Sequence, residues 1–253
     1  MIKPSKFFTL CAVSALLFAA GVAQAAPVMF SKSAENLANS RVAEAAFITN
    51  LGGGHVTETF EGFAANTRGN PLMSTLVGSF SMITPGSGGA CGNPTGIALG
   101  GCNEGVAILD GTPGLFGGRI NTTVGGRKWL DSFDAMEFRF NPLANMNSVG
   151  FFISDPNDSG GRFTIKSTGI SDPTTYDFGQ IFGAGGLSNG QVFYLSFTST
   201  SAISSISIFS NAKGDGFGID NVTVGNKVPE PGTIALLGLG LLAAGAIRRR
   251  RTA

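Results

Sequence analysis

Residues 135–142 read AMEFRFNP, and residues 191–199 read QVFYLSFTS. Both stretches alternate apolar and other residues with a period of two. The apolar positions are Met136, Phe138 and Phe140 in the first stretch and Phe193, Leu195 and Phe197 in the second. Side chains of a β-strand point alternately to its two faces, so this period predicts strands with one face on a hydrophobic core.

Similar short runs recur along most of the chain after Gly54. The further strands that we predict are 55–63, 74–83, 105–110, 127–130, 148–154, 162–168, 174–182, 203–210 and 216–224. Clusters rich in Gly, Pro, Asn, Asp and Ser separate them, and no helical period lies between them. This pattern predicts an all-β fold, an antiparallel, jelly-roll-like β-sandwich. A closed barrel is the alternative, because periodicity does not distinguish the two.

One helix is predicted ahead of the strands. Residues 31–51, SKSAENLANSRVAEAAFITNL, are rich in alanine and contain neither glycine nor proline. The three glycines at 52–54 end the run. We expect a short amphipathic helix that packs on the sandwich.

The N-terminus has the pattern of a secretory signal peptide. Lys3 and Lys6 precede an apolar run over residues 7–22, and Ala23-Gln24-Ala25 follows it. A basic region, an apolar region and a small-x-small site predict cleavage between Ala25 and Ala26. The alternative is an uncut N-terminal anchor.

The charge of the chain is unevenly distributed. The whole chain has a formal net charge of +1, but residues 26–228 contain eleven Lys and Arg against fifteen Asp and Glu, a net charge of about −4. Both terminal segments are basic. A mildly acidic body gives no electrostatic footprint for nucleic acid, so we expect no nucleic-acid partner.

Two cysteines remain after the predicted cleavage. Cys91 and Cys102 close the glycine-rich stretch CGNPTGIALGGC. In an exported protein this arrangement predicts a disulfide. A metal or redox pair is the alternative, but no second Cys/His pair completes a zinc site and the spacing is not C-x-x-C.

The sequence lacks residues that several classes of enzyme need for catalysis. His55 is the only histidine, so a His-cluster metal site is excluded and any Ser-His-Asp triad would have to use it. A carboxylate pair, as in glycoside hydrolases, is the remaining option. The densest group is Asp131, Asp134 and Glu137, whose spacing of three places Asp131 and Asp134 on opposite faces of a strand. We interpret this group as a turn followed by a solvated strand.

The acidic residues of this sequence favour a Ca²⁺ site over a catalytic site, because a hard cation needs only clustered oxygen ligands. One candidate is the loop that contains Asp155 and Asp158. The other pairs Glu61 with Asp215 or Asp220, which lie near the first and last predicted strands. This arrangement resembles jelly-roll carbohydrate-binding modules, in which those two strands jointly hold a structural Ca²⁺. The alternative for the first loop is an ordinary β-turn.

A carbohydrate site would need an aromatic side chain on which a sugar ring can stack. Trp129, Tyr176 and Tyr194 are the only Trp and Tyr residues of the chain. Trp129 is the candidate platform because it follows a glycine turn and two basic residues. Its alternative role is that of a core or edge aromatic.

The C-terminus reads VPEPGTIALLGLGLLAAGAIRRRR over residues 228–251. The apolar run 232–247 spans only about 24 Å as a helix, which is short for a stable membrane span. The four arginines at 248–251 predict a cytoplasmic end and an external body. The alternative is a plain membrane anchor.

This tail resembles the PEP-CTERM sorting signal of bacterial exported proteins, with Pro229, Glu230 and Pro231 as the motif. The resemblance implies processing near the motif by exosortase, a membrane-embedded protease, and release or surface attachment of the product. It also implies a bacterium that makes exopolysaccharide.

The sequence therefore predicts a signal peptide (1–25), a helical lead-in (26–54), a β-sandwich (55–227) and a sorting signal (228–253). We expect an exported protein of the cell surface or extracellular matrix, with a transient membrane-anchored intermediate. Its expected role is non-enzymatic, by adhesion or carbohydrate contact in exopolysaccharide or biofilm. The alternative is a secreted glycan-active hydrolase or lyase that uses a carboxylate pair.

Overall fold

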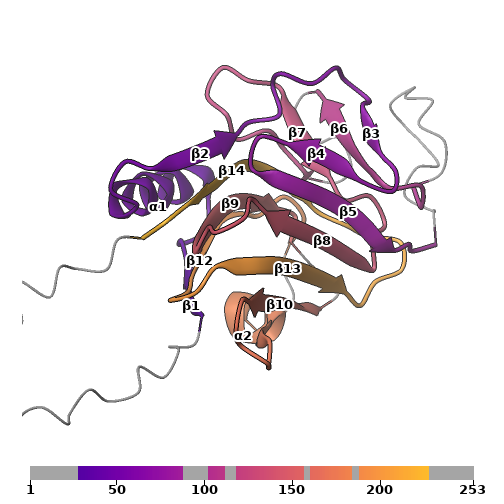
Figure 1. Cartoon of the computed structure of the whole chain (residues 1–253). Coiled ribbons are helices and arrows are strands. Elements are labelled where there is room, and N and C mark those ends of the chain that lie inside the picture. Colours follow the sequence, from indigo (N-terminus) through magenta and orange to yellow (C-terminus); the bar gives the residue numbers. More distant parts are fainter. Residues whose placement is uncertain (1–27, 88–101, 112–117, 157–159, 184–187, 228–253) are drawn as a thin grey trace, which may run out of the picture.

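The computed structural model describes residues 28–87, 102–111, 118–156, 160–183 and 188–227. Two antiparallel sheets pack face to face (Figure 1), which confirms the predicted all-β sandwich. The predicted signal peptide, the sorting tail, Cys91 and Asp158 lie outside the described residues.

The larger sheet has eight strands among the described residues. Across the sheet the order is β1 (Met29–Lys32), β12 (Val192–Thr198), β9 (Ser148–Ser154), β14 (Gly218–Gly225), β7 (Lys128–Asp131), β6 (Val106–Asp110) and β3 (Arg68–Gly69), and β2 (His55–Glu58) also pairs with β14.

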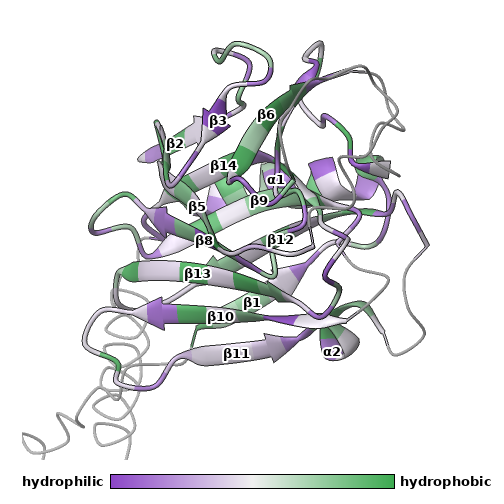
Figure 2. Cartoon of the chain, turned by 90° about the vertical axis from the view of Figure 1, so that its right-hand side faces the viewer, coloured by the Kyte–Doolittle hydropathy of each residue, from purple (hydrophilic) through white to green (hydrophobic). Residues whose placement is uncertain are grey.

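The smaller sheet has six strands in the same part of the chain. Its order is β11 (Thr174–Asp177), β10 (Gly161–Ser167), β13 (Ile203–Ser210), β8 (Glu137–Pro142), β5 (Gly78–Thr84) and β4 (Met73–Thr75). Figure 2 shows β8, β13, β10 and β11 following one another in this order. The predicted strand 174–182 is only half a strand, because α2 (Phe178–Phe182) begins directly after β11.

The core between the sheets is built from the alternating residues. Phe138 and Phe140 of β8 are buried, whereas Glu137 and Arg139, which alternate with them, are half-buried on the outer face. The ring of Phe140 stacks on that of Phe80 at 4.4 Å between centroids. Burial of these large apolar side chains is the main stabilising contribution of the fold.

The helix α1 (Leu37–Asn50) begins later than the predicted residue 31. Residues 29–32 instead form β1, which pairs with β12 at the edge of the larger sheet. Asn36 caps the helix, since its side chain accepts a hydrogen bond of 2.9 Å from the backbone N–H of Asn39.

α1 covers the outer face of the larger sheet. Phe47 and Leu51 pack there with Phe152, Val192 and Tyr194 in a second apolar cluster. Gly150 makes this approach possible, because a Cβ at that position would collide with the Tyr194 hydroxyl and the Phe47 ring. The second face of β12, predicted as the outer one, is therefore covered by the helix.

The last strand, β14, lies in the middle of the larger sheet and divides its pairing. On one side it pairs with β9. On the other side Gly218 and Ile219 pair with β7, whereas residues 222–225 pair with β2. The register shifts between Asp220 and Thr223, and Asn221 has a φ of 45°. Asp220 thus lies at the fork where β14 leaves β7 and meets β2.

Candidate functional site

The carboxylate of Asp220, at this fork, accepts hydrogen bonds from the loop that precedes β7. Its Oδ2 atom accepts hydrogen bonds from the backbone N–H of Thr122 at 2.6 Å, the Thr122 hydroxyl at 2.9 Å and the backbone N–H of Thr123 at 3.1 Å. Its Oδ1 atom accepts one from the backbone N–H of Asn221 at 2.8 Å. We call residues 118–127 the fork loop.

The environment of Asp220 changes its acidity. The side chain is 1% exposed, and burial raises the pKa of its carboxyl group to about 7, although hydrogen bonds from Thr122, Asn221 and Thr123 oppose the rise. The group therefore changes charge near neutral pH inside the fold.

Glu61, which follows β2, holds the other end of the fork loop. Its Oε1 atom accepts from the backbone N–H groups of Lys128 at 2.7 Å and Arg127 at 2.8 Å, and from Asn121 Nδ2 at 3.1 Å. The same nitrogen lies 3.2 Å from Asp220 Oδ2. Asn121 therefore connects the two carboxylates. Glu61 and Asp220 are thus close in space, as one of the two predicted pairings requires.

Arg119, at the start of the fork loop, is surrounded by three aspartates. The guanidinium lies 2.8 Å from Asp131 Oδ1, 3.3 Å from Asp215 Oδ1 and 3.8 Å from Asp155 Oδ2. Arg119 is only 2% exposed. Burial lowers the pKa of its guanidinium, but Asp131, Asp215 and Asp155 outweigh this and hold the pKa above its usual value.

Asp131 ties this cluster to the core. Its Oδ2 atom accepts from the Trp129 indole N–H at 3.1 Å, and its Oδ1 atom accepts from the backbone N–H of Phe133 at 2.8 Å. Gly218 allows β14 to lie close to Trp129 and Arg119, because a Cβ at this position would lie 3.0 Å from the Trp129 side chain and 3.3 Å from the Cβ of Arg119. Arg119 thus fixes the fork loop to β7, to the loop after β9 and to the loop before β14.

The residues predicted to bind calcium are regrouped by the fold. Glu61 meets Asp220 through Asn121, whereas Asp155 meets Asp215 through Arg119. Within the described ranges no group of three or more His, Cys, Asp or Glu residues is arranged to hold a metal ion. Calcium at Glu61 and Asp220 stays a prediction.

A calorimetric experiment tests this calcium prediction. If Ca²⁺ binds between Glu61 and Asp220, EDTA will lower the melting temperature of the mature domain and Glu61→Gln will remove the response. The Asp172→Asn variant is the control, because Asp172 is exposed and outside both groups. A melting temperature that EDTA leaves unchanged removes the site.

The candidate catalytic carboxylates do not form an open pair. Asp131 and Asp134 are both 0% exposed, and Glu137 Oε1 accepts from Arg139 Nη2 at 2.7 Å on the other sheet. His55 is exposed at the start of β2. Trp129 is 0% exposed, so it is a core residue and no sugar platform.

Sequence reasoning did not identify Arg119 and Asn121, although they organise both groups. Neither belongs to a recognisable motif, and the only signal nearby is the pair of glycine doublets at 117–118 and 125–126. Cys102 is fully buried beside Trp129 and Phe133. Because Cys91 lies outside the described residues, the disulfide stays a prediction.

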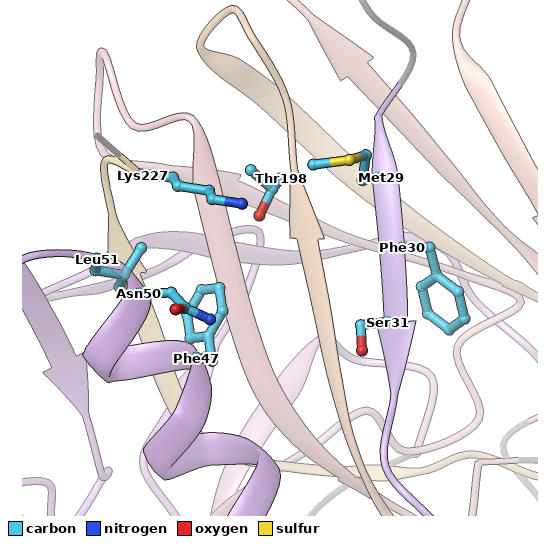
Figure 3. A pocket seen from close by; sticks show the side chains of 8 residues that line it. All are labelled: Met29, Phe30, Ser31, Phe47, Asn50, Leu51, Thr198 and Lys227. Atoms are coloured by element: carbon cyan, nitrogen blue, oxygen red, sulfur yellow. The ribbon is translucent and has the colours of Figure 1, made fainter. Parts of the chain in front are cut away.

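A cavity of about 270 Å³ lies between β1, the end of α1 and the end of β12. Its lining residues are Met29, Phe30, Ser31, Phe47, Asn50, Leu51, Thr198 and Lys227. In Figure 3 the side chains of Lys227 and Met29 point toward each other, with Thr198 between them. The cavity therefore joins the first strand of the domain to the residue that directly precedes the Val-Pro-Glu-Pro sequence.

No helix within the described residues is long and apolar enough to cross a membrane. A comparison with curated proteins gives no match. The comparison with protein families gives one for the C-terminal segment. Residues 227–251 match the PEP-CTERM protein-sorting motif, so this chain is an exported protein that exosortase processes after a transient membrane-anchored stage.

Proposed function

We propose that the mature domain is a non-enzymatic protein of the cell surface or extracellular matrix, and that it acts by contact with exopolysaccharide in a biofilm. The sorting motif supports the export route on which this proposal depends. The proposed contact itself rests on the chemistry of the domain surface.

The burial of the candidate acids is the observation that carries the proposal. A glycosidase needs two carboxyl groups that face the scissile bond from opposite sides. Asp131 and Asp134 are both 0% exposed, so neither reaches a polymer in solvent. The acidic residues Asp131, Asp155, Asp215, Glu61 and Asp220 instead fix the fork loop. This favours a structural role for the acids and a binding role for the domain.

The outer face of the six-stranded sheet offers a polar surface for such contact. Consecutive pairings place five residues in one row across the sheet: Ser81, Arg139, Ser207, Thr164 and Thr175. Ser81 and Ser207 are buried, so the accessible part of the row is Arg139, Thr164 and Thr175. Hydroxyl groups both donate and accept hydrogen bonds, and a guanidinium donates several, which suits the hydroxyls and carboxylates of a polysaccharide. We call these residues the hydroxyl row.

Within the hydroxyl row, Arg139 is held in place by its neighbours. Its Nη2 atom donates to Glu137 and its Nε atom donates to Ser207 Oγ at 3.2 Å. Thr164 is half-buried and Thr175 is exposed on the adjoining strands. The row thus presents an arginine paired with Glu137 and, beyond Ser207, two threonine hydroxyls.

A sedimentation experiment tests the proposal with the purified mature domain and matrix polysaccharide from the producing cells. We expect wild type to co-sediment, and the double variant Arg139→Gln/Thr164→Ala to lose most of this binding. Arg127→Gln is the matched control, because Arg127 is an exposed arginine in the fork loop. Thermal melts confirm that the variants are folded.

Two outcomes would overturn the proposal. Wild-type protein that stays in the supernatant would remove the polysaccharide contact. Release of new sugar ends that disappears in Glu137→Gln or Asp134→Asn would favour the alternative, a hydrolase or lyase.

A further inference from the structure

The two ends of the described domain are each fixed by a side chain from a distant part of the sequence: Tyr176 of β11 and Asn147, which precedes β9. At the N-terminal end the Tyr176 hydroxyl donates to the carbonyl of Val28, which is 3% exposed. At the C-terminal end Asn147 Oδ1 accepts from the backbone N–H of Lys227 at 2.9 Å, and the backbone N–H of Asn147 donates to Asn226 Oδ1 at 3.0 Å. The folded domain therefore extends to the residue before the Val-Pro-Glu-Pro sequence.

Both ends leave from the same end of the larger sheet. Met29 of β1 lies opposite Thr198, Thr198 lies opposite Ser148, and Ser148 lies opposite Gly225 of β14. In Figure 1 the start of β1 and the end of β14 lie on the same side of the molecule. The cavity lined by both Met29 and Lys227 is at this position. We call its lining residues the exit face.

The chain between the exit face and each hydrophobic segment is short. Four residues separate Lys227 from the apolar run that begins at Gly232, and five separate Val28 from the run that ends at Val22. Even fully extended, such connections reach only about 17–21 Å. While either apolar segment is in the membrane, the exit face must therefore stay close to the bilayer.

The composition of the exit face fits a lipid surface. Its lining includes one cation, Lys227, and no carboxylate, although the body of the protein is acidic. Met29 is apolar and 56% exposed. A lysine beside an exposed apolar side chain matches anionic headgroups next to the hydrocarbon boundary.

We infer that the exit face lies against the lipid headgroups of the exporting membrane in the unprocessed protein and becomes free when the terminal segments are removed. The inference rests on the sorting motif and the placement of the two ends. It does not depend on the polysaccharide contact, so either proposal can fail without the other.

Cysteine labelling tests the inference in the full-length precursor, held in the membrane of cells that lack exosortase. The probe is a membrane-impermeant maleimide. Met29→Cys reports on the exit face, and Ile83→Cys is the matched control. Ile83 is a large apolar residue, 42% exposed, in β5 near Thr84, which pairs with Glu137 at the other end of the sandwich. The protein without an added cysteine gives the background.

We expect Met29→Cys to react several-fold more slowly in the anchored precursor than in the released mature protein, whereas Ile83→Cys reacts equally in both. A linker of about a dozen Gly and Ser residues between Lys227 and Val228, which adds roughly 40 Å of reach, should remove the protection. Reconstitution in vesicles of phosphatidylethanolamine and phosphatidylglycerol should reproduce it.

Equal reaction rates for Met29→Cys in the anchored and released forms would overturn the inference. Protection that is seen in cells but is missing from lipid vesicles would also overturn it, and would assign the exit face to another membrane protein instead. Secretion of the mature Met29→Cys protein from cells with exosortase shows that the variant folds.

Discussion

Replacing Arg119 with methionine is expected to lower the free energy of unfolding by about 3–5 kcal/mol, because removing one partner of a buried ion pair leaves the other charge uncompensated. Asp131 is 0% exposed and Asp155 is 7% exposed, so neither carboxylate can recover its hydration in the folded state. Urea denaturation of the mature domain, followed by fluorescence of the single Trp129, measures the loss.

The control for this prediction comes from the same fork loop. Arg127 pairs with Asp110 at 2.9 Å, but its side chain is 70% exposed. Arg127→Met should therefore cost less than about 1 kcal/mol. The double variant Arg119→Met/Asp131→Asn should be more stable than Arg119→Met alone. Equal losses for Arg119→Met and Arg127→Met would show that the buried cluster contributes no more than a surface pair.

Asp220→Asn is expected to change how stability depends on pH. The pKa of Asp220 is about 7 in the folded state, above its ordinary value of 3.8, so the folded protein binds a proton there more tightly than the unfolded chain does. The stabilisation from that proton is complete below about pH 4 and is lost as the pH rises through about 7. Over this window the contribution amounts to roughly 4 kcal/mol.

Because asparagine stays neutral, the variant lacks this dependence. The unfolding free energy of wild type minus that of Asp220→Asn should decrease from pH 4 to pH 8 in matched urea titrations. Asp172→Asn, at an exposed position, should show no comparable trend. A difference that increases with pH would mean that hydrogen bonds from Thr122, Thr123 and Asn221 outweigh burial and favour the charged carboxylate.

The strands and the sandwich follow from local alternation. Phe138 and Phe140 face the core because each lies two residues from the next apolar position, and this depends on nothing distant in the chain. β1 was not predicted, because MFSK is short and becomes a strand only by pairing with β12. Pairing partners of this kind are decided by tertiary structure, and propensity alone does not reveal them.

The candidate site shows the same limit more strongly. The sequence predicts that Glu61 lies near Asp215 or Asp220, because the first and last predicted strands run side by side in jelly-roll modules. β2 and β14 do pair, and Glu61 and Asp220 share Asn121 as a hydrogen-bond donor. The proximity of Asp155 to Asp215 could not be predicted. It depends on Arg119, which contacts both residues although they lie 36 and 96 positions further along the sequence. No periodicity in the sequence encodes such a distant contact.

The central position of β14 has a consequence for the order of events during export. β14 is the last of the described strands, yet it pairs with β9, β7 and β2. A protein exported from its N-terminus therefore has an incomplete larger sheet until residues 218–225 have left the membrane. The sorting motif follows within a few residues. The larger sheet can therefore be completed only when the tail is about to enter the bilayer.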